Sequence, residues 1–180
     1  TTLGALLRQR FGYGRSAASL AERHPGALAP VRMSGWSALA WALVIARRPW
    51  LGLAVAAGTT VALLRKLADL PRVEAAKLAG RGHLAAGRQM AQATTRVWWP
   101  VALLAAVLSR RARLPVAAAF TVPVIVDAIR GRTLQPVIDA PLVTLDQMAY
   151  GAGVWAGVLA ERQPGPLLPD FTNWPPRAGG

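Results

Sequence analysis

The chain has 180 residues, which is room for one domain or one membrane module and excludes a second full-size catalytic domain. Hydrophobic residues make up 53% of it and the mean hydropathy is +0.32, which excludes a disordered chain and indicates membrane contact. A net charge of +13 indicates an anionic partner, either a membrane surface or a nucleic acid. Because 19 of the 21 cations are arginine, a GC-rich coding bias is an alternative source of this charge. The absence of cysteine excludes disulfides and thiol chemistry.

Residues 1–32 are predicted to form an interfacial amphipathic helix and a linker. Leucine and aromatic residues alternate with arginines over residues 2–23, a pattern typical of a basic helix lying in the plane of a membrane interface. Gly12 and Gly14 weaken this helix, and His24-Pro25-Gly26 is expected to end it.

Four runs without charged residues predict two apolar helical hairpins, one over residues 33–64 and the other over residues 97–129. Each run is shorter than the roughly 18–20 residues that a perpendicular helix needs to cross a bilayer, so the hairpins either borrow flanking residues or dip into the membrane. Arginine clusters separate the two runs of each hairpin. An arginine at the bilayer centre costs about 2.5–3.5 kcal/mol, so both clusters are expected to be surface turns. The runs are residues 33–46, 49–64, 97–109 and 114–126, and the clusters are residues 47–48 and 110–113.

The remaining segments are polar. Residues 65–96 are predicted to form a cytoplasmic amphipathic helix, residues 130–162 a linker and last helix, and residues 163–180 a Pro-rich tail that is extended or disordered. Gly151, Gly153 and Gly157 in the last helix permit a close approach of another helix. The expected fold class is all-α, with membrane-associated hairpins of about four short apolar helices flanked by amphipathic interfacial helices.

Cation counts predict the orientation in a cell membrane. If all four runs cross, twelve cations flank them on one side and five on the other, which places both termini on the cytoplasmic side. Tryptophans support the membrane interpretation because they lie at or near the starts of apolar runs, where indoles settle at the headgroup level. The alternative is that they are core aromatics of a soluble helical bundle. These tryptophans are Trp36, Trp50, Trp98 and Trp99.

Local catalytic and metal motifs are not found in the sequence. The carboxylates form no Asp-x-Asp pair, and His24 and His83 have no zinc spacing, so no catalytic or metal-ligating residue is assigned. Asp127 and Arg130 are interpreted as an interfacial pair. One cluster remains as a candidate site. Arginines beside aromatics can bind a pyrophosphate, or they can hold the helix to anionic lipid; the residues are Arg8, Gln9, Arg10, Phe11 and Tyr13.

The stretch RQRFGYGRSAASLAERHPGALAPVRMSGWSALAWAL resembles the region after the catalytic domain of family 2 glycosyltransferases, and among these it looks most like the mycofactocin-system glycosyltransferases of actinobacteria. The segments GRGHLAAGRQMAQATTRVWWPVALLAAVLSRRAR and DQMAYGAGVWAGVLAER are similar to the same family. The family's (Gln/Arg)-x-x-Arg-Trp motif overlays on Arg10 and Phe11. Its leading position falls on Leu7, and Arg8 or Gln9 is expected to substitute for it.

The resemblance implies the C-terminal membrane-associated part of an inverting GT-A glycosyltransferase, without its catalytic domain. Such an enzyme would transfer glucose from a UDP-sugar to the peptide-derived redox cofactor mycofactocin, with Arg10 contacting the diphosphate. A divalent metal, Mg or Mn, is expected in the catalytic domain and no cofactor in this chain. The expected partners are the lipid bilayer, the UDP-sugar and the mycofactocin precursor. A non-enzymatic basic membrane scaffold is the alternative. Nucleic acid is not expected as a partner, because the tryptophans lie in apolar runs.

Overall fold

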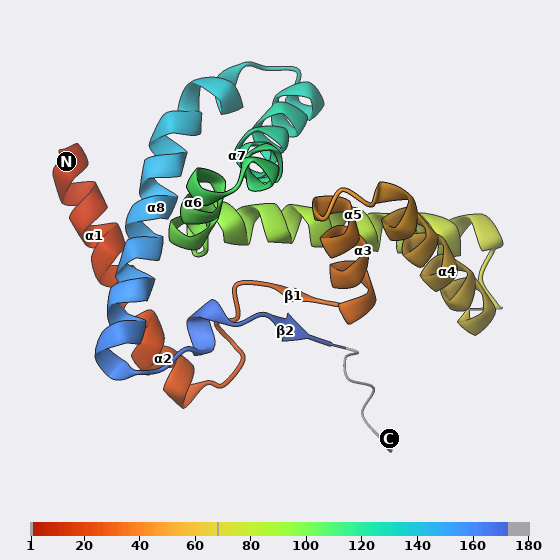
Figure 1. The fold of residues 1–180 in the computed structure, drawn as a ribbon, viewed down its shortest axis with the longest axis horizontal. Coiled ribbons are helices and arrows are strands. Elements are labelled where there is room, and N and C mark those ends of the chain that lie inside the picture. Colours follow the sequence, from red (N-terminus) through yellow and green to blue (C-terminus); the bar gives the residue numbers. More distant parts are fainter. Residues whose placement is uncertain (1, 68, 173–180) are drawn as a thin grey trace. The chain divides into compact units, whose positions relative to one another are not determined.

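The computed structural model describes residues 2–67 and 69–172. Within this part the chain is predominantly helical, which confirms the all-α class (Figure 1). In chain order the elements are α1 (Leu3–Arg15), α2 (Ala17–Arg23), β1 (Arg32–Met33), α3 (Gly35–Ile45), α4 (Pro49–Lys66), α5 (Arg72–Arg96), α6 (Trp99–Leu108), α7 (Arg110–Gly131), α8 (Gln135–Glu161), the 3-10 turn η1 (Gly165–Leu167) and β2 (Asp170–Phe171).

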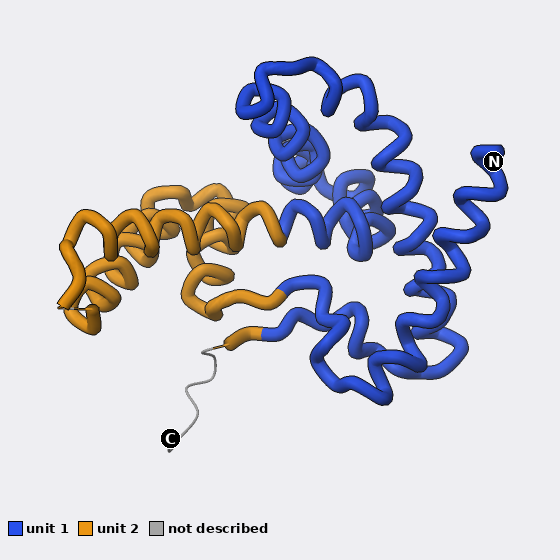
Figure 2. The backbone as a smooth tube through the Cα atoms, turned by 180° about the vertical axis from the view of Figure 1, so that it is seen from behind, with its two compact units in different colours: residues 1–31, 90–170 blue, residues 32–89, 171–180 orange. Residues whose placement is uncertain are grey.

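The chain divides into two compact units (Figure 2). Unit 1 contains residues 1–31 and 90–170, and unit 2 contains residues 32–89 and 171–180. The division between them falls within α5. Each unit is therefore built from segments that are distant in the sequence.

In unit 1, α1 runs alongside α8, and α2 and η1 pack at the C-terminal half of α8 (Figure 1). The core is small and consists largely of alanine and valine: Ala17, Ala18, Val97, Val154 and Val158. Short side chains allow the helix backbones to approach closely, so this unit is held by backbone proximity more than by large apolar side chains.

In unit 2, α3 and α4 pack as a hairpin, and the predicted turn at Arg47-Arg48-Pro49 is confirmed. Ser34 caps α3, its hydroxyl accepting from the Trp36 amide at 3.3 Å. Arg47 has a left-handed backbone with φ 62°, and Pro49 occupies the first turn of α4, where its missing N–H costs nothing. A Cβ at Gly52 would overlap the carbonyl oxygen of Ala40, so this glycine permits the close packing of the hairpin.

The second predicted turn is wrong. Arg110–Arg113 forms the first turn of α7, and the break from α6 is confined to Ser109, whose backbone is extended (φ −131°, ψ 119°). Arginine is a good helix former, and the Arg113 Nε also donates to the Ala106 carbonyl at 3.1 Å. Helix α7 has a mean hydropathy of 1.6 over its most apolar part, none of which is buried. In the described part of the chain it is the one helix long and apolar enough to cross a membrane.

Four other boundaries differ from those predicted. The helix predicted over residues 65–96 begins at Arg72, because α4 continues to Lys66. The first helix is interrupted at Ser16, and α8 begins at Gln135 rather than near residue 142, with Pro141 inside it. The Pro-rich tail is more ordered than expected: it forms η1 and then β2, whose Asp170 amide donates to the Val31 carbonyl at 2.8 Å. The rest of the predicted tail, residues 173–180, lies outside the described residues.

Candidate functional site

The predicted binding residues lie on two successive turns of α1. An α-helix turns about 100° per residue, so Arg8 and Arg10 are about 160° apart around the axis and cannot approach one anion from the same face. Gln9 and Tyr13 do come together, the Gln9 Nε2 donating to the Tyr13 hydroxyl at 2.9 Å. The structure therefore divides the cluster between different faces of α1.

Arg10 forms an ion pair with Asp146 of α8, in which its Nε donates to the carboxylate Oδ1. The side chains are 44% and 25% exposed, so solvent screens the pair and its contribution to stability is modest. The sequence did not indicate Asp146 as a partner, because 136 residues separate it from Arg10. Only the packing of α1 on α8 brings the two together.

Glycines set the distance between α1 and α8. A Cβ at Gly14 would overlap the Tyr150 carbonyl oxygen, and a Cβ at Gly153 would overlap that of Phe11. A Cβ at Gly157 would likewise overlap the Arg15 carbonyl oxygen. The predicted close approach to the last helix is thus confirmed, and Gly14, which was expected only to weaken the first helix, is needed for it. This packing also fixes the register that places Arg10 beside Asp146.

The end of α5 and the start of α6 occupy another side of α8. A Cβ at Gly151 would overlap the Arg96 carbonyl oxygen. The Thr95 hydroxyl donates to Gln147 Oε1 at 2.9 Å, and the Arg96 guanidinium lies 4.1 Å from the centre of the Tyr150 ring, a cation–π contact. Helix α8 is therefore held on two sides over residues 146–157.

Tryptophan indoles stabilise this second contact and also bind η1. Trp155 Nε1 donates to the Val97 carbonyl at 2.7 Å, Trp99 Nε1 to the Met148 carbonyl at 3.2 Å, and Trp98 Nε1 to the Leu167 carbonyl at 2.8 Å. Trp98 and Trp99 were interpreted as headgroup anchors, but their N–H groups are used inside unit 1. By contrast, Trp36 and Trp50 are exposed, at 43% and 80%.

The candidate site is therefore Arg10 and its neighbours on one side of α1, and this arginine already binds a carboxylate. Tyr13 is exposed on the same side of α1, Phe11 is 38% exposed, and Arg8 is exposed on the opposite face. Guanidinium groups bind carboxylates and phosphates in the same planar geometry, so an arginine that pairs with Asp146 is also suited to a phosphate oxygen. The described residues contain no group of three or more His, Asp or Glu side chains that could hold a metal ion.

Comparison with known proteins found two similar proteins that carry the same name. The chain is similar to the "Pre-mycofactocin glycosyltransferase" of Mycobacterium tuberculosis strain CDC 1551 / Oshkosh and to that of strain ATCC 25618 / H37Rv, with 38% identity over 184 aligned residues in each case. The match covers 95% of this chain and 39% of each relative. No family model matches the chain, and no solved structure matches it. The resemblance to the mycofactocin-system glycosyltransferases is thus confirmed: over nearly its whole length, this chain is similar to part of a pre-mycofactocin glycosyltransferase.

Proposed function

We propose that this chain is the C-terminal membrane-associated module of an inverting glycosyltransferase, which transfers glucose from a UDP-sugar to the mycofactocin precursor. The observation that carries the proposal is the 38% identity along 95% of the chain to proteins named for pre-mycofactocin glycosylation. The chain spans 39% of the length of those relatives, so we place the sugar-nucleotide domain and its Mg or Mn ion in the part that it does not span.

A role in binding the leaving diphosphate is proposed for α1. Arg10 is half exposed and holds an anion, so a diphosphate oxygen could replace the Asp146 carboxylate without any rearrangement of the helix. Tyr13 lies near Arg10 on the same side of α1 and accepts from Gln9, so both would contact the donor or the acceptor, with the Phe11 ring packing against it. Arg8, on the opposite face of α1, would contact anionic lipid instead. Positive charge placed at a departing diphosphate stabilises the transition state more than the ground state.

Association with the cytoplasmic membrane is proposed for the apolar helices. At about 1.5 Å per residue, the 22 residues of α7 span about 33 Å, which matches a hydrocarbon core of about 30 Å. Arginines stand at both ends of α7, where they can reach the headgroups. The shorter helices α3 and α6 would dip into one leaflet. Exposed side chains such as Leu108 at 76% and Ile129 at 71% would then be covered by lipid.

The function is tested in the native host by deleting the coding region for residues 1–162 from the chromosomal gene. Mass spectrometry of cell extracts is expected to show that glycosylated mycofactocin disappears and its aglycone accumulates, with recovery when the intact gene is restored. Unchanged glycosylation would count against the proposal and favour the scaffold alternative. Membranes from the restored strain, supplied with UDP-glucose and other UDP-sugars in turn, identify the donor, and the anomeric coupling in the product identifies inversion.

A further inference from the structure

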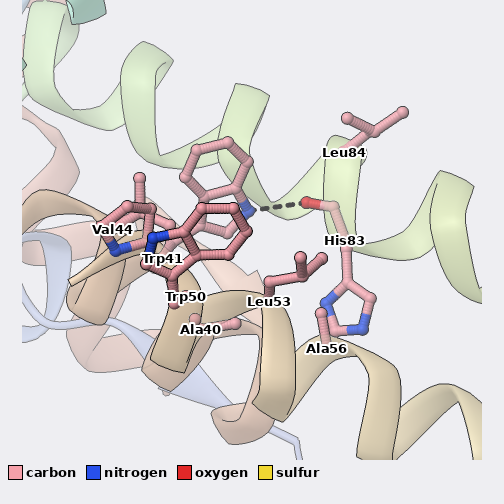
Figure 3. Close-up of a pocket in the computed structure, with 10 residues that line it drawn as sticks. Ala40, Trp41, Val44, Trp50, Leu53, Ala56, His83 and Leu84 are labelled. Atoms are coloured by element: carbon pink, nitrogen blue, oxygen red, sulfur yellow. Dashed lines mark hydrogen bonds between the residues drawn. The ribbon is translucent and has the colours of Figure 1, made fainter.

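Unit 2 contains a pocket of about 400 Å³ that the proposed function does not use. It lies where α3, α4 and the first half of α5 meet (Figure 3). Its volume falls within the range of about 300–1,000 Å³ that is usual for small-molecule sites. Its lining is apolar except for His83 and includes Trp41, Trp50, Leu53 and Ala56.

The walls of this pocket are fixed by specific contacts. Figure 3 shows the Trp41 indole turned toward the His83 carbonyl, to which its Nε1 donates at 2.7 Å. A Cβ at Gly87 would overlap the Trp41 ring, so this glycine makes room for the indole. The His83 imidazole is held on both sides, its Nδ1 lying 3.1 Å from the Ser37 hydroxyl and its Nε2 3.1 Å from that of Thr59. The polar atoms of His83 are thereby bound to neighbouring helices and leave the pocket apolar.

Two arginines directly precede the residues that form one side of the pocket. Pro49 and Trp50 line it, and the two residues directly before them, Arg47 and Arg48, are both exposed. The left-handed backbone of Arg47 fixes the turn that carries these arginines. The carboxylates in the sequence of unit 2 are Asp69 and Glu74, at the far end of α4 and in α5. An apolar pocket beside two arginines fits an amphiphile with an anionic headgroup.

We propose that the pocket binds an anionic glycerophospholipid, with one acyl chain in the pocket and the phosphate bound by Arg47 and Arg48. The apolar lining excludes a sugar nucleotide. The two guanidinium groups favour a phosphate in a headgroup of net negative charge over one whose charge is balanced by a cationic group such as choline. Trp50 is 80% exposed although it lines the pocket, as expected of an indole that lies against a lipid at the headgroup level. The proposal uses no residue of α1 and does not depend on glycosyl transfer.

The test measures lipid binding by the full chain, purified in a mild detergent, by native mass spectrometry without any sugar donor. Phosphatidylglycerol and phosphatidylcholine with identical acyl chains are titrated in parallel. Phosphatidylglycerol is expected to bind at least about tenfold more tightly, as one lipid per chain. The double variant Arg47→Gln/Arg48→Gln is expected to abolish this preference. Ala56→Leu fills the pocket and is expected to weaken both lipids.

The matched control is Arg65→Gln/Lys66→Gln, which removes the same charge from the other end of α4 and is expected to bind lipid like the wild type. Trp50→Ala provides a second pocket variant that does not endanger folding, because its side chain is exposed. The proposal is overturned if the control loses the preference as fully as the arginine variant, because binding then follows the general surface charge. It is also overturned if the two lipids bind equally, if both pocket variants bind like the wild type, or if the pocket is covered by a second copy in a two-chain complex.

Discussion

The guanidinium of Arg10 on α1 and the carboxylate of Asp146 on α8 form an ion pair, although 136 residues separate them in the sequence. Arg10 directly precedes Phe11, and Asp146 lies one helical turn before Tyr150, so the pair lies next to the glycine contacts of the two helices, on their N-terminal side. An arginine in this position can serve the packing of α1 on α8 or the binding of an anionic ligand, and the two roles predict different outcomes.

Replacing Arg10 with alanine in the intact enzyme is expected to lower glucosyl transfer by about 10²–10³-fold, the usual loss when a group that stabilises developing negative charge is removed. Membrane association is expected to remain unchanged. Turnover is measured with UDP-glucose and purified precursor. The control is Arg23→Ala, which removes the same charge from the end of α2 and is expected to leave turnover unaltered. Equal rates in Arg10→Ala and wild type would contradict a role in phosphate binding.

Exchanging the two partners separates packing from ligand binding. The double variant Arg10→Asp/Asp146→Arg re-forms an ion pair with its charges reversed. Its free energy of unfolding is therefore expected to lie within about 1 kcal/mol of that of the wild type. Its glucosyl transfer is expected to stay as low as that of Arg10→Ala, because α1 then presents a carboxylate to the diphosphate. Recovery of turnover together with stability would show that Arg10 acts only through packing.

Gly153→Ala is expected to destabilise unit 1, because the added methyl group would overlap the Phe11 carbonyl and force α1 away from α8. Overpacking of this kind costs about 1–3 kcal/mol. The loss is measured by SDS titration in mixed micelles, with the helical circular dichroism as the signal. The control is Gly12→Ala in α1, where a Cβ meets nothing within 4 Å. This change is expected to stabilise the helix by about 0.5–1 kcal/mol, and a loss there equal to that of Gly153→Ala would contradict the explanation.

Gly87→Ala is expected to displace the Trp41 indole and break its bond to the His83 carbonyl. Near-ultraviolet circular dichroism and tryptophan emission should therefore change, and phosphatidylglycerol binding should weaken with the distortion of the pocket wall. Gly82→Ala, on the same helix and with open space at its Cβ, is the control and is expected to leave both measurements unchanged. An unaltered spectrum in Gly87→Ala would show that Trp41 does not depend on this glycine.

Val122→Arg tests whether α7 enters the bilayer. Val122 is 51% exposed near the middle of α7, where an arginine in lipid costs about 2.5–3.5 kcal/mol. The fraction of chain that floats with liposomes is expected to fall. Leu114→Arg is the control, because Leu114 is 67% exposed near the arginines at the start of α7, where a new cation can reach the headgroups. If both variants float like the wild type, α7 does not lie in the hydrocarbon.

Much of the helical architecture could be predicted because its signals are local. The turn at Arg47-Arg48-Pro49 followed from two charges and a proline, and the glycines of α8 indicated a close helix contact. The turn at Arg110–Arg113 was predicted wrongly because it was inferred from the cost of arginine in lipid, whereas the first turn of a helix can carry those arginines at the membrane surface. The Asp146 partner of Arg10 had no local signal.

By itself, the sequence determined the all-α class, the positions of most helices, the excess of positive charge and the resemblance to a glycosyltransferase, because each of these is encoded in composition or in runs of neighbouring residues. Only the tertiary structure decided which glycines touch which helix, that Trp98 and Trp99 are bonded within unit 1, and that Arg10 is paired. The physical reason is that these contacts join residues tens of positions apart, and their geometry exists only after the helices have packed.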